Sequence, residues 1–221
     1  MQGYLIWGFA HILLFVFWLG ADVGVFLAAT MARNPKRSFE ARMALIRLAL
    51  LIDIFPRVSF ALILPVGLHL TSALNLYPIS DELLATGWML AAYWLASLIF
   101  ITRSEGTKLA TNLGRLQMLS HAMVGLILVV IGLNSLATGA PLEETWFALK
   151  LLLFGLVFWT AIAIDLCFRP FLEPFMEIGQ QGSTPEREEA VSRAINNTLV
   201  AVGALYGLIA TIAFLGKVKP F

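Results

Sequence analysis

The chain has 221 residues, of which 59% are hydrophobic and 13% charged, with a net charge of +1 and a mean hydropathy of +0.84. This composition lies outside the range of soluble domains and predicts an integral membrane protein. The near-neutral charge argues against nucleic-acid binding, and the single cysteine, Cys167, excludes an internal disulfide and a CxxC motif.

Apolar runs of about 20 residues, the length that crosses a bilayer as a helix, occur six times along the chain. We expect an all-α bundle of six transmembrane helices that forms a single domain over residues 1–221. The first run lacks an early basic cluster and a small-residue cleavage site, so it is predicted to be a retained helix and not a signal peptide. The helices are expected near 4–31, 43–75, 83–102, 116–137, 145–168 and 197–216.

The longest connection, about 169–196, leads into the sixth helix. Its tetrapeptide Ser183-Thr-Pro-Glu186 has the form of a helix start, with a hydroxyl cap, a proline in the first turn and a following carboxylate. The sixth helix is therefore expected to begin outside the membrane and run into it. Once the six spans are removed, we expect no soluble domain to remain.

Basic residues gather in the connections on one side of the predicted bundle. The connections 32–42, 102–115 and 169–196 hold ten lysines and arginines, whereas the opposite connections and both termini hold only Lys217 and Lys219. The positive-inside rule places the three basic connections in the cytoplasm and both termini outside. We expect a multi-pass protein of the bacterial inner membrane.

The first helix carries two ionisable residues, His11 and Asp22, with Trp18 between them. Eleven positions at about 100° each return to nearly the same face, so the three residues share one stripe. Lipid offers no partner to an imidazole or a carboxylate, and such groups normally face the bundle interior and mark a site. This stripe predicts a functional site inside the bundle.

The remaining ionisable residues of the apolar runs sort by depth, at about 1.5 Å per residue along a helix. Those near the outer surface form one predicted group and those nearer the cytoplasm form another. The outer group is His11, His69 and Lys150, the inner group is Asp22, His121 and Asp165, and Asp53 and Arg57 lie between them.

Several of these residues also have a purely structural interpretation. Asp53 and Arg57 are four positions apart and are expected to form an intrahelical ion pair. Lys150 can extend to the outer headgroups, and His69 can lie in the membrane interface. Asp165, near the end of the fifth run, is interpreted as a helix-end charge.

Three histidines without a cysteine pattern restrict the metal chemistry. Zinc and copper sites usually need three or four ligands at one depth, and His121 is expected on the opposite side from His11 and His69. A haem needs only one or two axial ligands, and imidazole is a common one. Gly125 and Gly132 share a face with His121 and leave room either for a macrocycle or for close helix packing.

Two stretches resemble a known superfamily. Residues 11–26 (HILLFVFWLGADVGVF) and 146–154 (WFALKLLLF) are similar to the superfamily that unites HemJ-type protoporphyrinogen oxidases with CopD-type copper-resistance membrane proteins. The resemblance covers the first, fourth and fifth helices. On the HemJ side it implies a haem b ligand at His11 and a required lysine in a W-x-x-x-K-L motif at Lys150. On the CopD side it implies copper movement across the membrane.

We therefore predict a membrane redox protein that binds haem b and exchanges electrons with quinone or a membrane partner, acting as an oxidoreductase. Its iron ligands would be His11 and His69, and Lys150 would neutralise a propionate or a substrate carboxylate. His121 is a further cofactor-binding candidate. The predicted catalytic residues, which would handle charge or protons, are Lys150, Asp22, Asp53 and Arg57.

Two other function classes stay open at this point. One is a transporter of copper or another small solute, in which the buried charges line the path. The other is a structural membrane subunit, in which they only hold the helices together. In the last helix, Gly203-x-x-x-Gly207 predicts a close helix contact, either within the bundle or in a homodimer.

Overall fold

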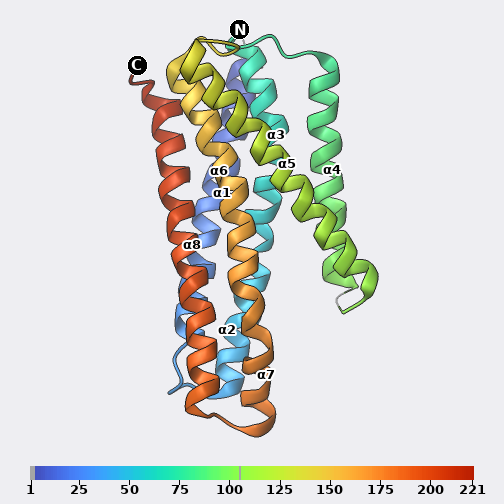
Figure 1. Cartoon of the computed structure of the whole chain (residues 1–221), viewed down its shortest axis with the longest axis vertical. Helices are drawn as coiled ribbons and strands as arrows, with labels where there is room; N and C mark the ends of the chain where they lie inside the picture. Colours follow the sequence, from blue (N-terminus) through green and yellow to red (C-terminus); the bar gives the residue numbers. More distant parts are fainter. Residues whose placement is uncertain (1–2, 105) are drawn as a thin grey trace.

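The computed structural model describes residues 3–104 and 106–221, and these residues form helices and no strand. Six helical segments within this part of the chain are long and apolar enough to cross a membrane, with α2–α3 and α6–α7 each forming one segment. The predicted all-α bundle of six membrane-length helices is confirmed. The helices are α1 (Gly3–Ala32), α2 (Phe39–Ile52), α3 (Ile54–Ala73), α4 (Asp81–Arg103), α5 (Lys108–Thr138), α6 (Thr145–Phe168), η1 (Arg169–Phe171), α7 (Leu172–Gln181) and α8 (Pro185–Val218) (Figure 1).

The long segments follow one another around a ring in chain order (Figure 1). Packing is dense between α1 and α3, between α5 and α6, and between α6 and α8, but sparse where α4 meets α5 and where α8 meets α1. The bundle therefore consists of two halves, α1–α4 and α5–α8, that meet along two thin seams. Both termini lie at one end of the long axis (Figure 1).

Large aromatic side chains fill the space between the two halves. Phe60 of α3 and Trp94 of α4 pack on Phe158 of α6, with ring centroids 4.6 and 5.7 Å apart. Buried aliphatic residues of α3, α5, α6 and α8 continue this core toward the termini. Apolar packing thus joins the halves in the part of the bundle nearer the termini.

Glycines bring α5 and α6 into backbone contact. A Cβ added at Gly132 would lie 2.7 Å from the Leu152 backbone nitrogen, and one added at Gly155 would lie 2.6 Å from the Gly125 carbonyl oxygen. Of the two predicted uses of Gly125 and Gly132, the structure shows close helix packing. Any larger residue at these positions would push the two helices apart.

The second segment is interrupted, whereas the sequence predicted one continuous helix over 43–75. α2 begins at Phe39, where the Ser38 hydroxyl accepts a hydrogen bond from the Ala41 backbone, and it ends at Ile52. Asp53 separates it from α3, and Pro56 follows in the first turn. Because Pro56 has no N–H, it cannot bond the carbonyl four residues earlier, and the helix breaks there.

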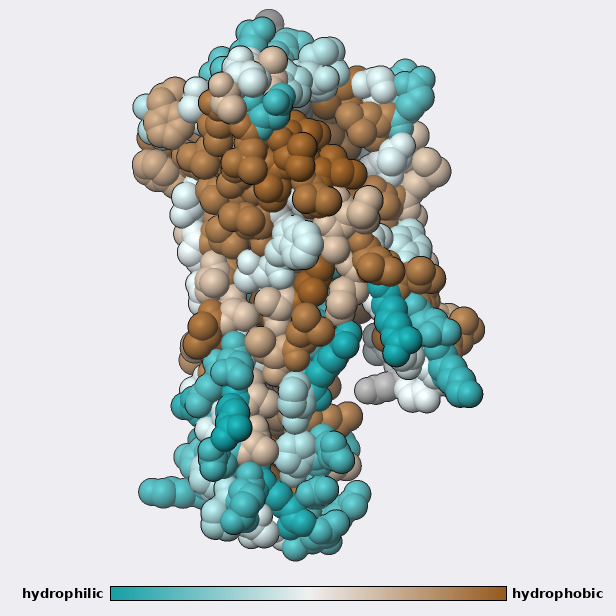
Figure 2. All heavy atoms as spheres, in the orientation of Figure 1, coloured by the Kyte–Doolittle hydropathy of each residue, from teal (hydrophilic) through white to brown (hydrophobic). Residues whose placement is uncertain are grey.

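Most of the residues between the fifth and sixth predicted spans are also helical. The predicted connection 169–196 folds into η1, α7 and the first turns of α8. α8 begins at Pro185 with the Thr184 side chain accepting a hydrogen bond from the Arg187 backbone, as the predicted helix start required. Phe175 and Ile178 of α7 pack against Ile195 of α8 in a second core. On the face shown in Figure 2 the surface at this end is hydrophilic.

A buried arginine joins three helices at this hydrophilic end. Arg42 of α2 is 1% exposed, and its two terminal nitrogens donate to the Glu188 carboxylate over 2.8 and 2.9 Å. Its Nε donates to the Ala32 carbonyl at the end of α1. Partial burial raises the pKa of Glu188, but hydrogen bonds from Arg42 and Ser183 outweigh it and hold that pKa below its usual value.

Removing the Glu188 charge is expected to destabilise the protein strongly. Glu188→Gln leaves Arg42 buried without its counter-ion, and breaking a buried pair costs roughly 3–5 kcal/mol. Because the folded-state pKa of Glu188 is lowered, the pair contributes fully above the ordinary glutamate pKa and is lost as pH falls through the lower value. Thermal unfolding of the detergent-solubilised protein at neutral and acidic pH measures both effects.

Glu189 provides the matched control one residue away. It pairs with Arg193, and both side chains are 70% exposed, so Glu189→Gln should cost less than about 1 kcal/mol. Equal losses from Glu188→Gln and Glu189→Gln would show that the buried pair does not hold this end together.

Candidate functional site

A cavity lies between the two halves of the bundle. Its volume is about 1310 Å³, including its open side, and residues of α1 to α6 and of α8 line it. The lining comes from the later turns of α1, α4 and α6 and the early turns of α3, α5 and α8. Because the chain direction alternates, the cavity occupies the part of the bundle nearer to the connections α1–α2, α4–α5 and α7–α8. The aromatic core closes it toward the termini.

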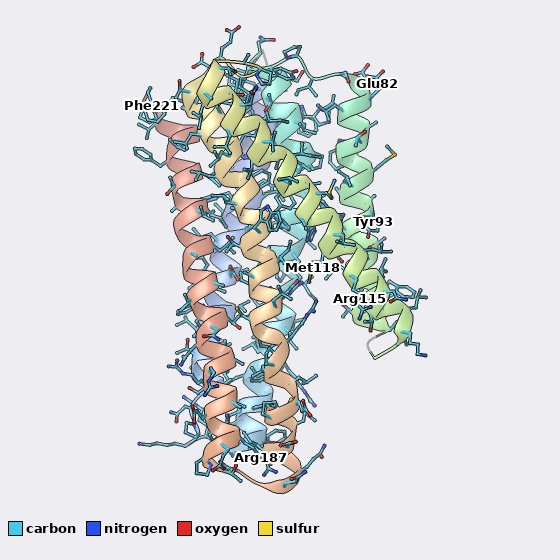
Figure 3. The ribbon with its side chains drawn as sticks, viewed as in Figure 1. Glu82, Tyr93, Arg115, Met118, Arg187 and Phe221 are labelled. Atoms are coloured by element: carbon cyan, nitrogen blue, oxygen red, sulfur yellow. The ribbon has the colours of Figure 1, made fainter. Side chains whose placement is uncertain are left out.

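The α4–α5 hairpin leaves one side of this region less covered. Figure 1 shows the hairpin leaning away from the other helices toward its tip. Figure 3 shows Arg115 and Met118 on the part of α5 that diverges. Leu98 of α4 and Gln117 of α5 contribute to the cavity lining from this hairpin.

Arg57 connects the two halves at this cavity. Its Nε donates to Asp53 over 2.6 Å, and its Nη2 donates to Asp165 of α6 over 3.1 Å. The predicted pair of Asp53 and Arg57 is confirmed. Asp165 lies in the last turn of α6, as its interpretation as a helix-end charge predicted, and it also binds Arg57 and lines the cavity. An ion pair therefore crosses from the α1–α4 half to the α5–α8 half.

Asp22 faces the same cavity without such a partner. The residue is 6% exposed and lines the cavity from α1. Within residues 3–104 and 106–221, no hydrogen bond or ion pair to its carboxylate is present. Trp18, one turn away, is buried and packs on Phe60 with ring centroids 5.2 Å apart. The prediction that Asp22 and Trp18 share an inward face of α1 is confirmed.

His121 lies in an aromatic box at the cavity wall. Its ring meets those of Phe60, Trp94 and Phe158 edge-on, with centroids 5.2, 4.8 and 5.8 Å away. Its Nε2 is buried and has no hydrogen-bond partner among the described residues. The structure thus brings the inner group of the sequence analysis, Asp22, His121 and Asp165, to one cavity together with Asp53 and Arg57.

The two outer histidines do not face each other. His11 packs against Gly67 of α3, and its Nδ1 is buried without a partner in the described chain. His69 stacks on Trp7 at 4.0 Å and accepts a hydrogen bond from Trp88 Nε1 over 3.0 Å. Gly67 and His69 are two positions apart on α3, so their side-chain directions differ by about 200°.

This arrangement does not fit a haem held by both histidines. The Nε2 lone pair of His69, which would bind iron, already accepts the Trp88 hydrogen bond. Across the described residues, no group of three or more His, Cys, Asp or Glu side chains is placed to hold a metal ion. A haem held by His11 alone stays a prediction, as does copper binding.

Lys150 lies on the opposite half of the bundle from both outer histidines. It is half-buried on α6, and its Nζ lies beside Gly216 of α8. A Cβ added at Gly216 would be 2.8 Å from this Nζ. The ion pairs formed within the described residues do not include Lys150. Its predicted pairing with a propionate or substrate carboxylate stays a prediction.

The Gly203-x-x-x-Gly207 motif faces outward. Both glycines are exposed, and no described atom lies within 4 Å of a Cβ added at either position. The motif therefore makes no close contact inside the bundle, and of its two predicted uses only a homodimer contact stays a prediction.

Two residues of the cavity wall were missed in the sequence analysis. Trp94 is buried, and its Nε1 donates to Ser120 over 2.9 Å beside the His121 box. Gln117, one turn before His121, also lines the cavity. Neither is ionisable, so a search for charges at membrane depth passed over them. The signal that could have found Gln117 is its amide in the same helical stripe as His121.

Comparison of the chain with protein family models, with curated proteins and with solved structures gave no match. The chemistry of the cavity is therefore the basis for a functional proposal.

Replacing Arg57 is expected to be more harmful than replacing either of its partners. Arg57→Gln leaves Asp53 and Asp165 without their shared cation, whereas Asp165→Asn leaves the pair of Asp53 and Arg57 in place. The combination of Arg57→Gln with Asp53→Asn and Asp165→Asn should recover part of the loss, with a coupling free energy of about 0.5–3 kcal/mol. Thermal unfolding in detergent measures the cycle, and purely additive losses would show that the three residues do not form a network.

Proposed function

We propose that the chain is a small-solute transporter whose substrate occupies the cavity between the two halves of the bundle. The observation that carries this proposal is a cavity that is lined from all six membrane-length segments, open on one side and bounded by an aromatic core toward the termini. Sites of transporters commonly lie near the bilayer midplane between halves that move relative to each other. The thin seams and the interrupted second segment support such movement here.

The charges of the cavity favour transport over a purely structural role. Charged side chains within a bilayer are costly and normally mark a substrate or ion pathway. A structural network needs its members paired with one another, and Arg57 is paired in this way with Asp53 and Asp165. Asp22 has no such partner in the described chain and faces an open volume large enough for a small molecule.

The proposed orientation follows from the basic connections. Ten lysines and arginines lie in the connections at the cavity's end of the bundle, so the positive-inside rule puts that end in the cytoplasm and both termini outside. In this orientation the cavity lies in the cytoplasmic part of the bundle, and the membrane is a bacterial inner membrane.

Two positions one turn apart on α6 test the movement of the halves. Ala161 lines the cavity, and Val157 is 0% exposed in the core that closes it. In a Cys167→Ala background, we expect Ala161→Cys to react with an impermeant thiol reagent from the cytoplasmic side of inverted vesicles. If the halves move, Val157→Cys should react from the opposite side in intact cells, more slowly than an exposed position.

Controls in the same background fix the orientation. Glu143→Cys, in the connection between α5 and α6, should be labelled in intact cells, and Ser183→Cys, before α8, should be protected there. The reverse pattern would overturn the orientation. Failure of Val157→Cys to react from either side would contradict a transport cycle in which the core opens.

A haem-linked redox function is the second candidate, and it rests on His11. The Nδ1 of His11 is buried and unpartnered in the described chain, and a buried imidazole nitrogen without a partner is a candidate ligand. A haem there would supply one-electron chemistry with quinone or another membrane partner. His11 would hold it from α1, and Lys150 would neutralise a propionate.

Colour separates this second candidate from transport. A haem bound through His11 gives the purified protein a sharp visible band that His11→Ala abolishes and His121→Ala leaves unchanged. A colourless protein from cells that were supplied with haem and iron would remove the redox function and leave the cavity proposal untouched.

A further inference from the structure

The inference concerns the ligand of the cavity and starts from Asp22. Its side chain is more than nine-tenths buried, lines the cavity, and has no hydrogen-bond or ion-pair partner among residues 3–104 and 106–221. An ionised carboxylate taken out of water is strongly destabilised unless a counter-ion compensates it. To be ionised in this position, the Asp22 carboxylate therefore needs a cation beside it.

The other charges of the cavity do not supply that counter-ion. Arg57 already donates to Asp53 and Asp165, and no further lysine or arginine lines the cavity within the described part of the chain. Three aspartates thus share one arginine. An anionic solute such as a phosphate or carboxylate would meet excess negative charge, whereas a cation would be attracted.

The walls select the kind of cation. Trp18 lies one turn from Asp22, and its ring packs on Phe60 in a lining that is mostly apolar. Aromatic faces attract organic cations through their quadrupole, and an apolar wall buries the body of such a molecule. A small metal ion would need several oxygen or nitrogen ligands, and no described group of three or more supplies them.

We propose that the cavity binds an organic monocation with an apolar or aromatic body, and that Asp22 is its counter-ion. This proposal rests on the proposed transport function and names the substrate class of the same cavity. Asp22 binds the charged centre, Trp18 and Phe60 cover the apolar body, and the pair of Arg57 and Asp165 stays at the mouth.

The first measurement needs no variant. Two rigid probes of nearly equal size and opposite charge, tetraphenylphosphonium and tetraphenylborate, are tested for saturable binding to the purified full chain in lipid nanodiscs. We expect the cation to bind at least tenfold more tightly than the anion after subtraction of partition into empty nanodiscs. Equal binding of the two probes, or no saturable binding of the cation, would overturn the proposal.

The second measurement assigns the charge to Asp22. Asp22→Asn, which keeps the shape and removes the charge, should weaken tetraphenylphosphonium binding at least tenfold, and Asp22→Glu should retain part of it. Asp81→Asn is the control, because Asp81 is exposed in the first turn of α4 and does not line the cavity. Wild-type affinity in a folded Asp22→Asn protein would remove Asp22 from the site.

The two proposals fail separately. Cation binding without labelling of Val157→Cys would leave a cation site in a protein that does not alternate between the two sides. Labelling of Val157→Cys without preference for the cationic probe would leave a transporter whose substrate is not an organic cation.

Discussion

The ion pairs of Arg57 set the geometry of the cavity. In a medium of low dielectric constant an arginine and its carboxylates must stay together, because separating them exposes uncompensated charge. Asp53 belongs to the break between α2 and α3, and Asp165 belongs to α6, so the guanidinium holds the interrupted segment of one half against the other half. Asp53, Arg57 and Asp165 all line the cavity, so this ionic contact between the halves forms part of its wall.

The two ends of the bundle are stabilised by different means. Toward the termini, aromatic rings interlock and glycines allow α5 and α6 to touch backbone to backbone, an arrangement that leaves little freedom. Toward the basic connections, the α4–α5 hairpin leans away from the other helices (Figure 1). There the halves are joined by a smaller hydrophobic core, in which Phe39 of α2 packs on Phe175 of α7, and by the ion pairs of Arg42 and Arg57. Ionic contacts can exchange partners at lower cost than an interdigitated core can repack.

Composition and run length were sufficient to predict six helices, and depth along them was sufficient to group Asp22, His121 and Asp165. The partner of Asp165 was not predictable. The depth of a residue along its helix does not show which neighbouring helix its side chain faces. The same limit applies to His69, which shares a depth with His11 but faces Trp88. The helix break was visible in Pro56, whereas η1 and α7 lack the long apolar run on which the span prediction depended.

Charge number and charge position together restrict what the cavity can hold. With Arg57 engaged by two carboxylates, the third carboxylate, Asp22, is the one free to bind a solute in the described chain. A cation at Asp22 would repel the guanidinium of Arg57. It would also attract the carboxylates of Asp53 and Asp165, and so weaken the ion pair of Arg57 and Asp165 that joins the halves. An anion would be repelled by the carboxylates and would leave Asp22 uncompensated. In the proposed complex, the cation that compensates Asp22 would therefore also favour separation of Arg57 from Asp165.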